Sequence, residues 1–228
     1  MAKSKKKKDN DNIVAVEEAL SKSEQFIERH QNTIIYTVGI IVILIAGYIG
    51  YTRFILEPRE QEALSEMFMA QSYFEQEEYE QALEGDAEYP GFLDIISDYR
   101  MTSASNLARF YAGVSLIRLG ELEDGIDQLD SFRKRDQLLG AMAYGAIGDA
   151  YWEMGELEDA ARAYRRAYNY KPNDLTTPLF LFKAGRLYEE MGDYEEALSR
   201  YEQIHREYSD SHEAREIEKY IARLQEKN

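Results

Sequence analysis

The stretch that decides the fold spans residues 141–174, with the sequence AMAYGAIGDAYWEMGELEDAARAYRRAYNYKPND. Small residues at Gly148 and Ala160 allow two antiparallel helices to approach closely, and larger side chains surround that contact. Gly155 ends the first helix, because glycine takes the left-handed C-cap conformation without steric cost. Pro172 stops the second helix, since proline has no backbone N–H and clashes with the preceding turn. The surrounding positions are Tyr144, Ile147, Tyr151, Leu157, Tyr164 and Ala167.

The same pattern recurs along the chain, which separates a solenoid from a single helical hairpin. The next copy is displaced by 37 positions, from Gly148 to Gly185, and two weaker copies lie upstream. This spacing resembles that of tetratricopeptide repeats, whose usual period is about 34 residues. We attribute the excess to a loop, Leu175–Thr177, before Pro178. The further copies contain Leu181, Gly185, Tyr188, Gly192, Tyr194, Ala197 and Tyr201; Ala112, Gly113, Leu116, Gly120, Leu122, Gly125 and Leu129; and Met69, Ala70, Tyr73, Tyr79, Ala82 and Leu83.

The sequence therefore predicts an all-α protein, with a single N-terminal transmembrane helix followed by a tetratricopeptide-repeat α-solenoid of about four helix pairs. We expect a basic head over residues 1–30, a membrane anchor over 31–56 and a repeat domain over 57–228. The expected repeats lie near residues 63–84, 106–139, 141–174 and 178–211, with a C-terminal helix over 212–226.

An uncharged apolar segment extends from Gln31 to Thr52. Its length matches a bilayer core crossed at about 1.5 Å per residue. Its ten Ile, Leu and Val residues supply roughly −3 to −6 kcal/mol of insertion free energy. A cleaved signal peptide is the main alternative. The long segment before the apolar run, the length of the run and the lack of a small-x-small site after Tyr51 favour an uncleaved anchor.

Basic residues are concentrated before the apolar segment, which predicts a cytoplasmic N-terminus and repeats outside the membrane. The preceding residues include the Lys5–Lys8 run, whereas only Arg53 and Arg59 follow closely. Lys5–Lys8 serve as a topology determinant, with weak contact to anionic lipid or the ribosome as the lesser alternative. Apolar residues in Asn12–His30 recur with the period of a short amphipathic helix. This segment either docks on a partner or is a solvated linker, and both alternatives stay open.

Small residues within the apolar segment predict a contact with a partner helix in the membrane. Ala46 and Gly50 are four residues apart, and Gly39 and Gly47 add further small positions. Such residues let helices approach closely in lipid. The alternative is that glycine is simply frequent in membrane helices.

Composition and motifs argue against an enzyme. Residues 1–56 carry eight Lys or Arg against six Asp or Glu, while the remaining residues carry 19 against 37. An acidic body repels phosphate backbones, so nucleic acid is not an expected partner. The chain has no cysteine and three histidines. His205 and His212 have no further ligands at converging spacing, and no phosphate loop or nucleophile motif is present, so we expect no metal, cofactor or catalytic residues.

The remaining candidate site is a surface. In a tetratricopeptide superhelix the first helix of each pair lines the concave face, which suits an extended or helical hydrophobic segment. The alternative is that a short solenoid partly closes and buries some of these side chains. The predicted groove residues are Met67, Phe74, Phe110, Ile117, Arg118, Trp152, Phe182 and Arg186.

The chain also resembles the YfgM-like family of tetratricopeptide membrane proteins. The resemblance begins with the basic head, the membrane segment and a short degenerate repeat that ends near Ala82-Leu83. It continues with a turn and helix at Gly91-Phe92-Leu93-Asp94-Ile95-Ile96 with Tyr99. It also includes Asn106-Leu107-Ala108 before Tyr111-Ala112-Gly113. This chain departs from the better-known enterobacterial pattern in its longer Lys-rich head and stronger third and fourth repeats.

The resemblance implies an ancillary subunit of the bacterial Sec translocon, anchored once in the inner membrane with its repeats in the periplasm. The implied partners are Sec channel subunits, a membrane-anchored parvulin-like periplasmic chaperone and exported polypeptides. The rival hypothesis is an envelope-assembly or cell-division scaffold that does not bind the translocon. Both are non-enzymatic interaction proteins.

Overall fold

The computed structural model describes residues 29–226, and these fall into two compact units that divide between Glu57 and Pro58. All named elements in the described residues are helices, so the prediction of an all-α fold is confirmed. The predicted basic head and its amphipathic helix lie, apart from Arg29 and His30, outside the described residues.

The first unit contains an apolar helix. Residues 29–51 are α-helical and are followed by a π-helical turn, η1 (Thr52–Leu56). The helical run Arg29–Glu75 is long and apolar enough to cross a membrane, and its most apolar window is not buried within the structure. Nothing lies within 4 Å of a Cβ built on Gly39, Gly47 or Gly50. Their predicted contact with a partner helix, together with Ala46, stays a prediction. Membrane anchors and signal sequences share this length and composition.

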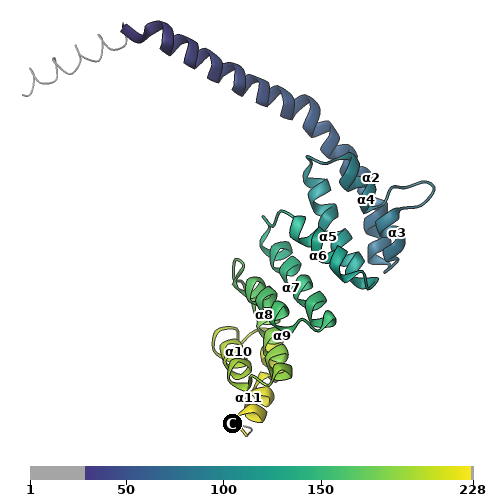
Figure 1. Ribbon diagram of the computed structural model, residues 1–228, viewed down its shortest axis with the longest axis vertical. Helices are drawn as coiled ribbons and strands as arrows, with labels where there is room; N and C mark the ends of the chain where they lie inside the picture. The colour runs from purple at the N-terminus through teal and green to yellow at the C-terminus, as the bar shows by residue number, and fades with distance from the viewer. Residues whose placement is uncertain (1–28, 227–228) are drawn as a thin grey trace, which may run out of the picture. The chain divides into compact units, whose positions relative to one another are not determined.

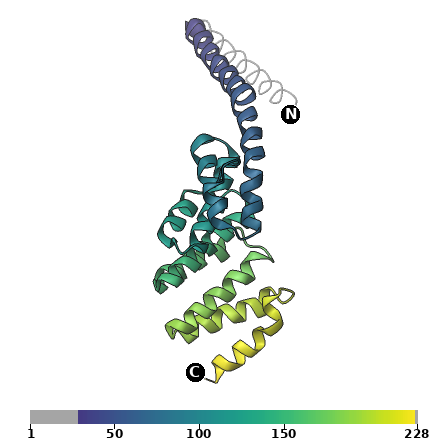
Figure 2. The same cartoon turned by 90° about the vertical axis from the view of Figure 1, so that its right-hand side faces the viewer.

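The second unit is a succession of helices from Pro58 onward, labelled in Figure 1. The helices are α2 (Glu57–Glu75), α3 (Tyr79–Glu84), α4 (Phe92–Asp98), α5 (Ser103–Arg118), α6 (Leu122–Ser131), α7 (Gln137–Met154), α8 (Leu157–Asn169), α9 (Thr176–Met191), α10 (Tyr194–Glu207), η2 (Glu213–Glu216) and α11 (Ile217–Gln225). Helices α5 and α6, α7 and α8, and α9 and α10 pack as pairs. In the second view the last two pairs and α11 stack in chain order (Figure 2).

Each complete pair is built on a glycine of the first helix that faces a large side chain of the second. A Cβ on Gly113 would lie 2.6 Å from the Leu129 side chain. A Cβ on Gly148 would lie 2.7 Å from the Tyr164 ring, and one on Gly185 would lie 2.5 Å from the Tyr201 ring. Real Cβ atoms do not approach so closely, so only glycine permits this spacing between the helices.

The N-terminal pair is truncated, and α4 completes its packing. Helix α3 has only six residues and ends at Gly85, whose φ is +76°. The Asp86 carboxylate accepts a 2.5 Å hydrogen bond from the Tyr73 hydroxyl and bonds from the backbone N–H groups of Glu88 and Tyr89. Helix α4 then buries Phe92, which stacks on Tyr111 of α5 with ring centroids 5.2 Å apart. The turn followed by a packed helix is therefore present as the sequence indicated.

The expected loop at Leu175–Thr177 is wrong in part, because α9 begins at Thr176. The Asn173 carboxamide oxygen accepts hydrogen bonds from the backbone N–H groups of Leu175 and Thr176, which starts the helix early. Pro178 consequently lies in the first turn, where its missing N–H removes no helical hydrogen bond. The extra residues lengthen the first helix of this pair.

Packing between successive pairs closes the core. Gly145 of α7 lies directly against the Phe180 ring of α9, and Phe180 is buried. The last helix, α11, buries Ile217 and Leu224 against the final pair. A solenoid leaves an apolar face at each end, and α11 covers it at this end.

Replacing Gly145 by valine should destabilise the repeat domain more than replacing Gly155 by alanine. The new side chain at Gly145 collides with the Phe180 ring, and overpacking of this kind costs about 1–3 kcal/mol. Gly155 has φ +79° but open space around it, so its variant meets only backbone strain of about 1 kcal/mol. Thermal unfolding followed by circular dichroism measures both variants. Equal melting temperatures for the two variants would contradict the packing described at Gly145.

Candidate protein-binding site

The first helices of the pairs form one continuous face. Helix α5 packs against α7, and α7 packs against α9, in addition to their contacts with their own second helices. We call the outward sides of α5, α7 and α9, extended by α2 and α11, the first-helix face. The predicted groove residues all come from these helices.

Two predicted groove residues are buried in the core. The Met67 side chain is 1% exposed and the Phe110 side chain is 8% exposed. The prediction that they line an open groove is wrong, because neighbouring helices cover them: Met67 packs in the cluster with Phe92 and Ile95, and the Phe110 ring lies 5.6 Å from that of Phe132.

Phe74 and Ile117 are half-buried and also contribute mainly to packing. The Phe74 ring makes edge contacts with Tyr79, Phe92 and Tyr111, with centroids 5.0–6.4 Å apart. Ile117 packs against Gly125 and belongs to the core cluster around Leu129. These side chains are therefore partly or wholly buried by neighbouring helices, as the alternative in the sequence analysis supposed for some groove residues.

The remaining predicted groove residues lie at the surface. Arg118 and Arg186 are exposed, and Trp152 and Phe182 are half-buried. The Trp152 indole N–H donates a 2.9 Å hydrogen bond to the Glu190 carboxylate. The Phe182 ring lies 5.2 Å from the ring of Tyr220 on α11.

Two cavities open beside these side chains at the C-terminal end of the face. One has a volume of about 450 Å³ and the other of about 660 Å³, and Tyr220 lines both. The smaller cavity is lined by Trp152, Arg186, Glu189, Glu190, Tyr220 and Arg223. The larger one is lined by Leu179, Phe182, His212, Glu213, Arg215, Glu216 and Tyr220.

Carboxylates on the first-helix face link each repeat to the next. Asp149 accepts a 2.6 Å hydrogen bond from the Tyr164 hydroxyl of its own pair, and it also pairs with Lys183 of the next first helix at 2.7 Å. Glu189 repeats this arrangement one unit later, accepting from the Tyr201 hydroxyl at 2.7 Å and pairing with Arg223 at 2.6 Å. Both ion pairs join residues 34 positions apart. These links hold successive first helices in register, and sequence analysis missed them.

An exposed apolar strip lies along the N-terminal halves of the first helices. Leu138 and Met142 are four residues apart on α7, and Leu175 and Leu179 occupy the corresponding positions at the start of α9. Residues four apart share one side of a helix. Leu64 and Phe68 form a separate exposed i, i+4 pair on α2, and the Phe68 side chain is 66% exposed. The apolar strip consists of Leu138, Met142 and Leu175, which are exposed, and Leu179, which is half-buried.

The apolar strip is separated from the charged part of the same face. Leu138 and Trp152 are 14 positions apart on α7, which corresponds to about 21 Å along a helix axis. The face thus offers apolar contact on one half and Arg, Glu and Trp side chains on the other. Sequence analysis did not identify the apolar strip. The available signal was the i, i+4 spacing of Leu138 with Met142 and of Leu175 with Leu179.

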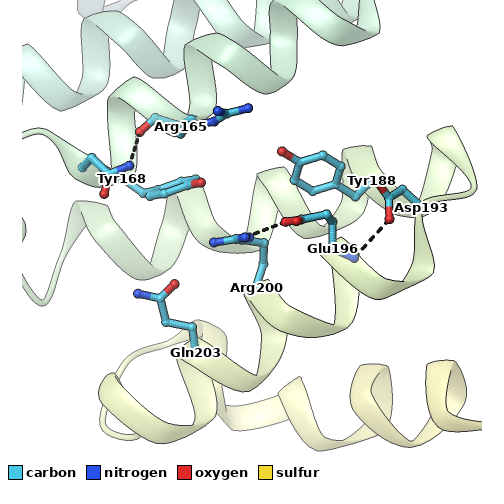
Figure 3. Close-up of a pocket in the computed structure, with 8 residues that line it drawn as sticks. Arg165, Tyr168, Tyr188, Asp193, Glu196, Arg200 and Gln203 are labelled. Atoms are coloured by element: carbon cyan, nitrogen blue, oxygen red, sulfur yellow. Dashed lines mark hydrogen bonds and ion pairs between the residues drawn. The ribbon is translucent and has the colours of Figure 1, made fainter.

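A further cavity, of about 550 Å³, lies on the side of the second helices, between α8, α9 and α10. Figure 3 shows that its side chains come from two successive repeats. They are Arg165, Tyr168, Asn169, Tyr188, Asp193, Glu196, Arg200 and Gln203. Among the described residues, no group of three or more His, Cys, Asp or Glu side chains is placed to hold a metal ion.

Comparisons with known proteins identify the repeats. Residues 106–174 and 180–211 each match a family model described as tetratricopeptide repeat. The structure also superposes on the TPR-like repeats of a kinesin light chain from Podosopora anserina, with a TM-score of 0.55 at 13% identity, covering 73% of this chain and 86% of that one. Crystal structures of MamA are also similar, one with a TM-score of 0.48 at 18% identity over 72% of this chain and 88% of that chain.

A curated relative is the chloroplastic protein FLUORESCENT IN BLUE LIGHT of Arabidopsis thaliana. It is 29% identical over 115 residues, which is 48% of this chain. The chain spans about a third of that protein's length, 35%. Residues 106–174 and 180–211 are thus tetratricopeptide repeats, a fold that generally serves in protein–protein interaction scaffolds, and no catalytic family is indicated.

Replacing Tyr164 by phenylalanine should lower the free energy of unfolding at neutral pH. It should also make that free energy fall less steeply as the pH rises above about 10. Burial, the Asp149 charge and the hydrogen bond to Asp149 all raise the pKa of Tyr164 well above its usual value. Because an unfolded tyrosine ionises near pH 10, the stabilisation is complete below about pH 10 and is lost as pH rises above that value.

The variant should lose about 1.5–3 kcal/mol near pH 7, the usual range for a hydrogen bond to a charged group. Its stability should then fall less steeply than that of the wild type above pH 10. Urea unfolding at a series of pH values between 7 and 11.5 measures both effects. Parallel pH profiles for the two proteins would contradict a protonated Tyr164 that stabilises the fold through Asp149.

Proposed function

We propose that this chain is a non-enzymatic, membrane-anchored interaction scaffold associated with the Sec translocon. In this proposal the anchor crosses the bacterial inner membrane once, with the N-terminus in the cytoplasm and the repeats in the periplasm. The observation that supports it best is the combination, in one chain, of an exposed apolar helix and a tetratricopeptide domain with an exposed apolar strip. The resemblance to YfgM-like proteins supplies the link to the translocon.

The proposed organisation follows the sequence. Residues 1–30 form the cytoplasmic head, residues 31–56 form the anchor, and residues 57–228 form the periplasmic repeat domain. The repeats are proposed near 63–84, 106–139, 141–174 and 178–211, followed by the C-terminal helix over 212–226. The bilayer is thus the first partner, through side chains such as Ile41 and Leu44, which are exposed along the helix.

The proposed protein partners are Sec channel subunits, a membrane-anchored parvulin-like chaperone and exported polypeptides. The first-helix face supports contact with an unfolded or helical apolar segment, because the apolar strip offers exposed aliphatic side chains on successive repeats. Its charged half, with Arg118, Trp152 and Arg186, supplies polar contacts and orientation. Excess acidic charge on the domain keeps it away from anionic headgroups and nucleic acid.

Cross-linking of the intact protein in native membranes, gentle solubilisation and mass spectrometry of the recovered chains test this proposal. The comparison is between the wild type and a variant with Leu138→Gln, Met142→Gln and Leu175→Gln. We expect Sec channel subunits with the wild type, together with a periplasmic chaperone or exported polypeptides. Recovery of the chaperone and polypeptides should fall at least about fivefold in the variant, because exposed apolar contacts of this size contribute about 1–3 kcal/mol together.

The matched control is Leu93→Gln with Met101→Gln, which changes two exposed apolar side chains outside the apolar strip. The control should recover the same chains as the wild type. Recovery of cell-wall or outer-membrane assembly proteins without Sec channel subunits would contradict the translocon proposal and favour the envelope-assembly or cell-division alternative.

A further inference from the structure

The cavity between α8, α9 and α10 contains polar groups that the repeat fold does not use. It lies on the side of the second helices, away from the apolar strip, and is drawn in Figure 3. Helix α8 supplies Arg165 and Tyr168, α9 supplies Tyr188, and α10 supplies Arg200. Two successive repeats are therefore needed to build it.

Two buried tyrosines direct their hydroxyl groups toward the cavity. Tyr168 and Tyr188 are each 8% exposed, and both line the cavity. Figure 3 shows the hydroxyl ends of the two rings turned toward one another. Buried tyrosine hydroxyls ordinarily find hydrogen-bond partners, as Tyr164 and Tyr201 do. Neither Tyr168 nor Tyr188 donates its hydroxyl proton to any other residue that the structure describes. Burial raises the pKa of Tyr168, so its hydroxyl remains a donor at neutral pH.

Arg200 adds an unused donor beside these rings. Its guanidinium lies 5.7 Å from the centre of the Tyr168 ring, and one terminal nitrogen pairs with Glu196 at 2.5 Å. The Arg200 Nε atom is buried and has no hydrogen-bond partner within the described chain. A buried N–H without a partner costs free energy.

The charges around the cavity select the ligand. Glu196 is engaged by Arg200, and the Asp193 carboxylate accepts from the Glu196 backbone N–H at the start of α10. The exposed Arg165 guanidinium makes no ion pair with other described residues, and the Asp193 carboxylate likewise pairs with no cation among them. Because these two arginines and two carboxylates balance, a ligand with one negative charge beside Arg165 meets less repulsion than a dianion does. A phosphate dianion would bring a second charge close to Asp193 and Glu196, which repel it.

We propose that this cavity binds a carboxylate group, held by the Arg165 guanidinium and the Tyr168 and Tyr188 hydroxyls, beside the Arg200 side chain. The site is independent of the apolar strip and of any Sec partner. The carboxylate can belong to an acidic side chain of a polypeptide or to a free organic acid, since both present the same planar oxyanion.

Isothermal titration calorimetry of the full-length protein in nanodiscs tests the site. The probes are succinate, the blocked tripeptide acetyl-Gly-Asp-Gly-amide, its Asn counterpart and inorganic phosphate. We expect saturable binding of at least one carboxylate probe, with the Asn peptide and phosphate each at least about tenfold weaker, because a charge-assisted hydrogen bond is worth about 1.5–3 kcal/mol. Tighter binding of the Asp peptide than of succinate identifies a polypeptide carboxylate, and the reverse order identifies a free organic acid.

The double variant Tyr168→Phe, Tyr188→Phe removes only the two hydroxyls, and Arg165→Gln removes the guanidinium charge. Each should weaken binding about tenfold or more with little change in melting temperature. Arg206→Gln is the matched control, because Arg206 is an exposed arginine of α10 outside this cavity, and it should bind like the wild type.

Absence of saturable carboxylate binding, equal binding of the Asn peptide, or tighter binding of phosphate would overturn the proposal. Retained binding in the Leu138→Gln, Met142→Gln, Leu175→Gln variant would show that the two sites are separate.

Discussion

The close approach of two helices at a glycine is the constraint on which the structure depends. In each complete repeat, Gly113, Gly148 or Gly185 lies directly against Leu129, Tyr164 or Tyr201 of the second helix. This contact fixes the distance within a pair, and the bulky partner then reaches the polar edge of the first helix. Tyr164 and Tyr201 hydrogen-bond to Asp149 and Glu189, which pair with cations of the next repeat. One steric constraint thereby sets both the pair and the alignment of its neighbours.

Much of the fold could be predicted from the sequence, because its determinants are local. The spacing from Gly148 to Ala160 and the C-cap glycine Gly155 specify a hairpin without reference to the rest of the chain. Contacts between repeats were not predictable in this way. Phe110 has the spacing of a groove residue, yet Phe132 and its neighbours cover it. Gly145 drew no attention in the sequence because its partner, Phe180, belongs to the next repeat.

The candidate sites show the same division. Trp152, Phe182, Arg118 and Arg186 follow from the repeat register and lie at the surface. The cavity on the side of the second helices depends on Tyr168 and Tyr188, which are also ordinary repeat residues by spacing. Only the three-dimensional arrangement shows that their hydroxyl groups face a cavity and donate no hydrogen bond to another described residue. The cavity is recognised from the burial of these residues and from their hydrogen-bond partners, and both depend on tertiary packing.

The repeat domain presents two chemically different sides. The first-helix face combines an apolar strip with a charged half, whereas the opposite side holds a small polar cavity. An apolar surface suits polypeptides that have yet to fold, and in the proposed scaffold the membrane anchor confines this surface to the place where those polypeptides emerge. This pairing of anchor and surface is the physical basis of the proposed scaffold.

Site-specific photo-cross-linking in intact cells tests this central claim most directly. A photoreactive phenylalanine analogue placed at Met142, in the apolar strip, should form adducts with Sec-associated or exported polypeptides. The same analogue at Glu202, an exposed position on α10, should form few or none. Equal adducts from both positions, or adducts from Glu202 alone, would contradict an account in which the first-helix face binds the partner.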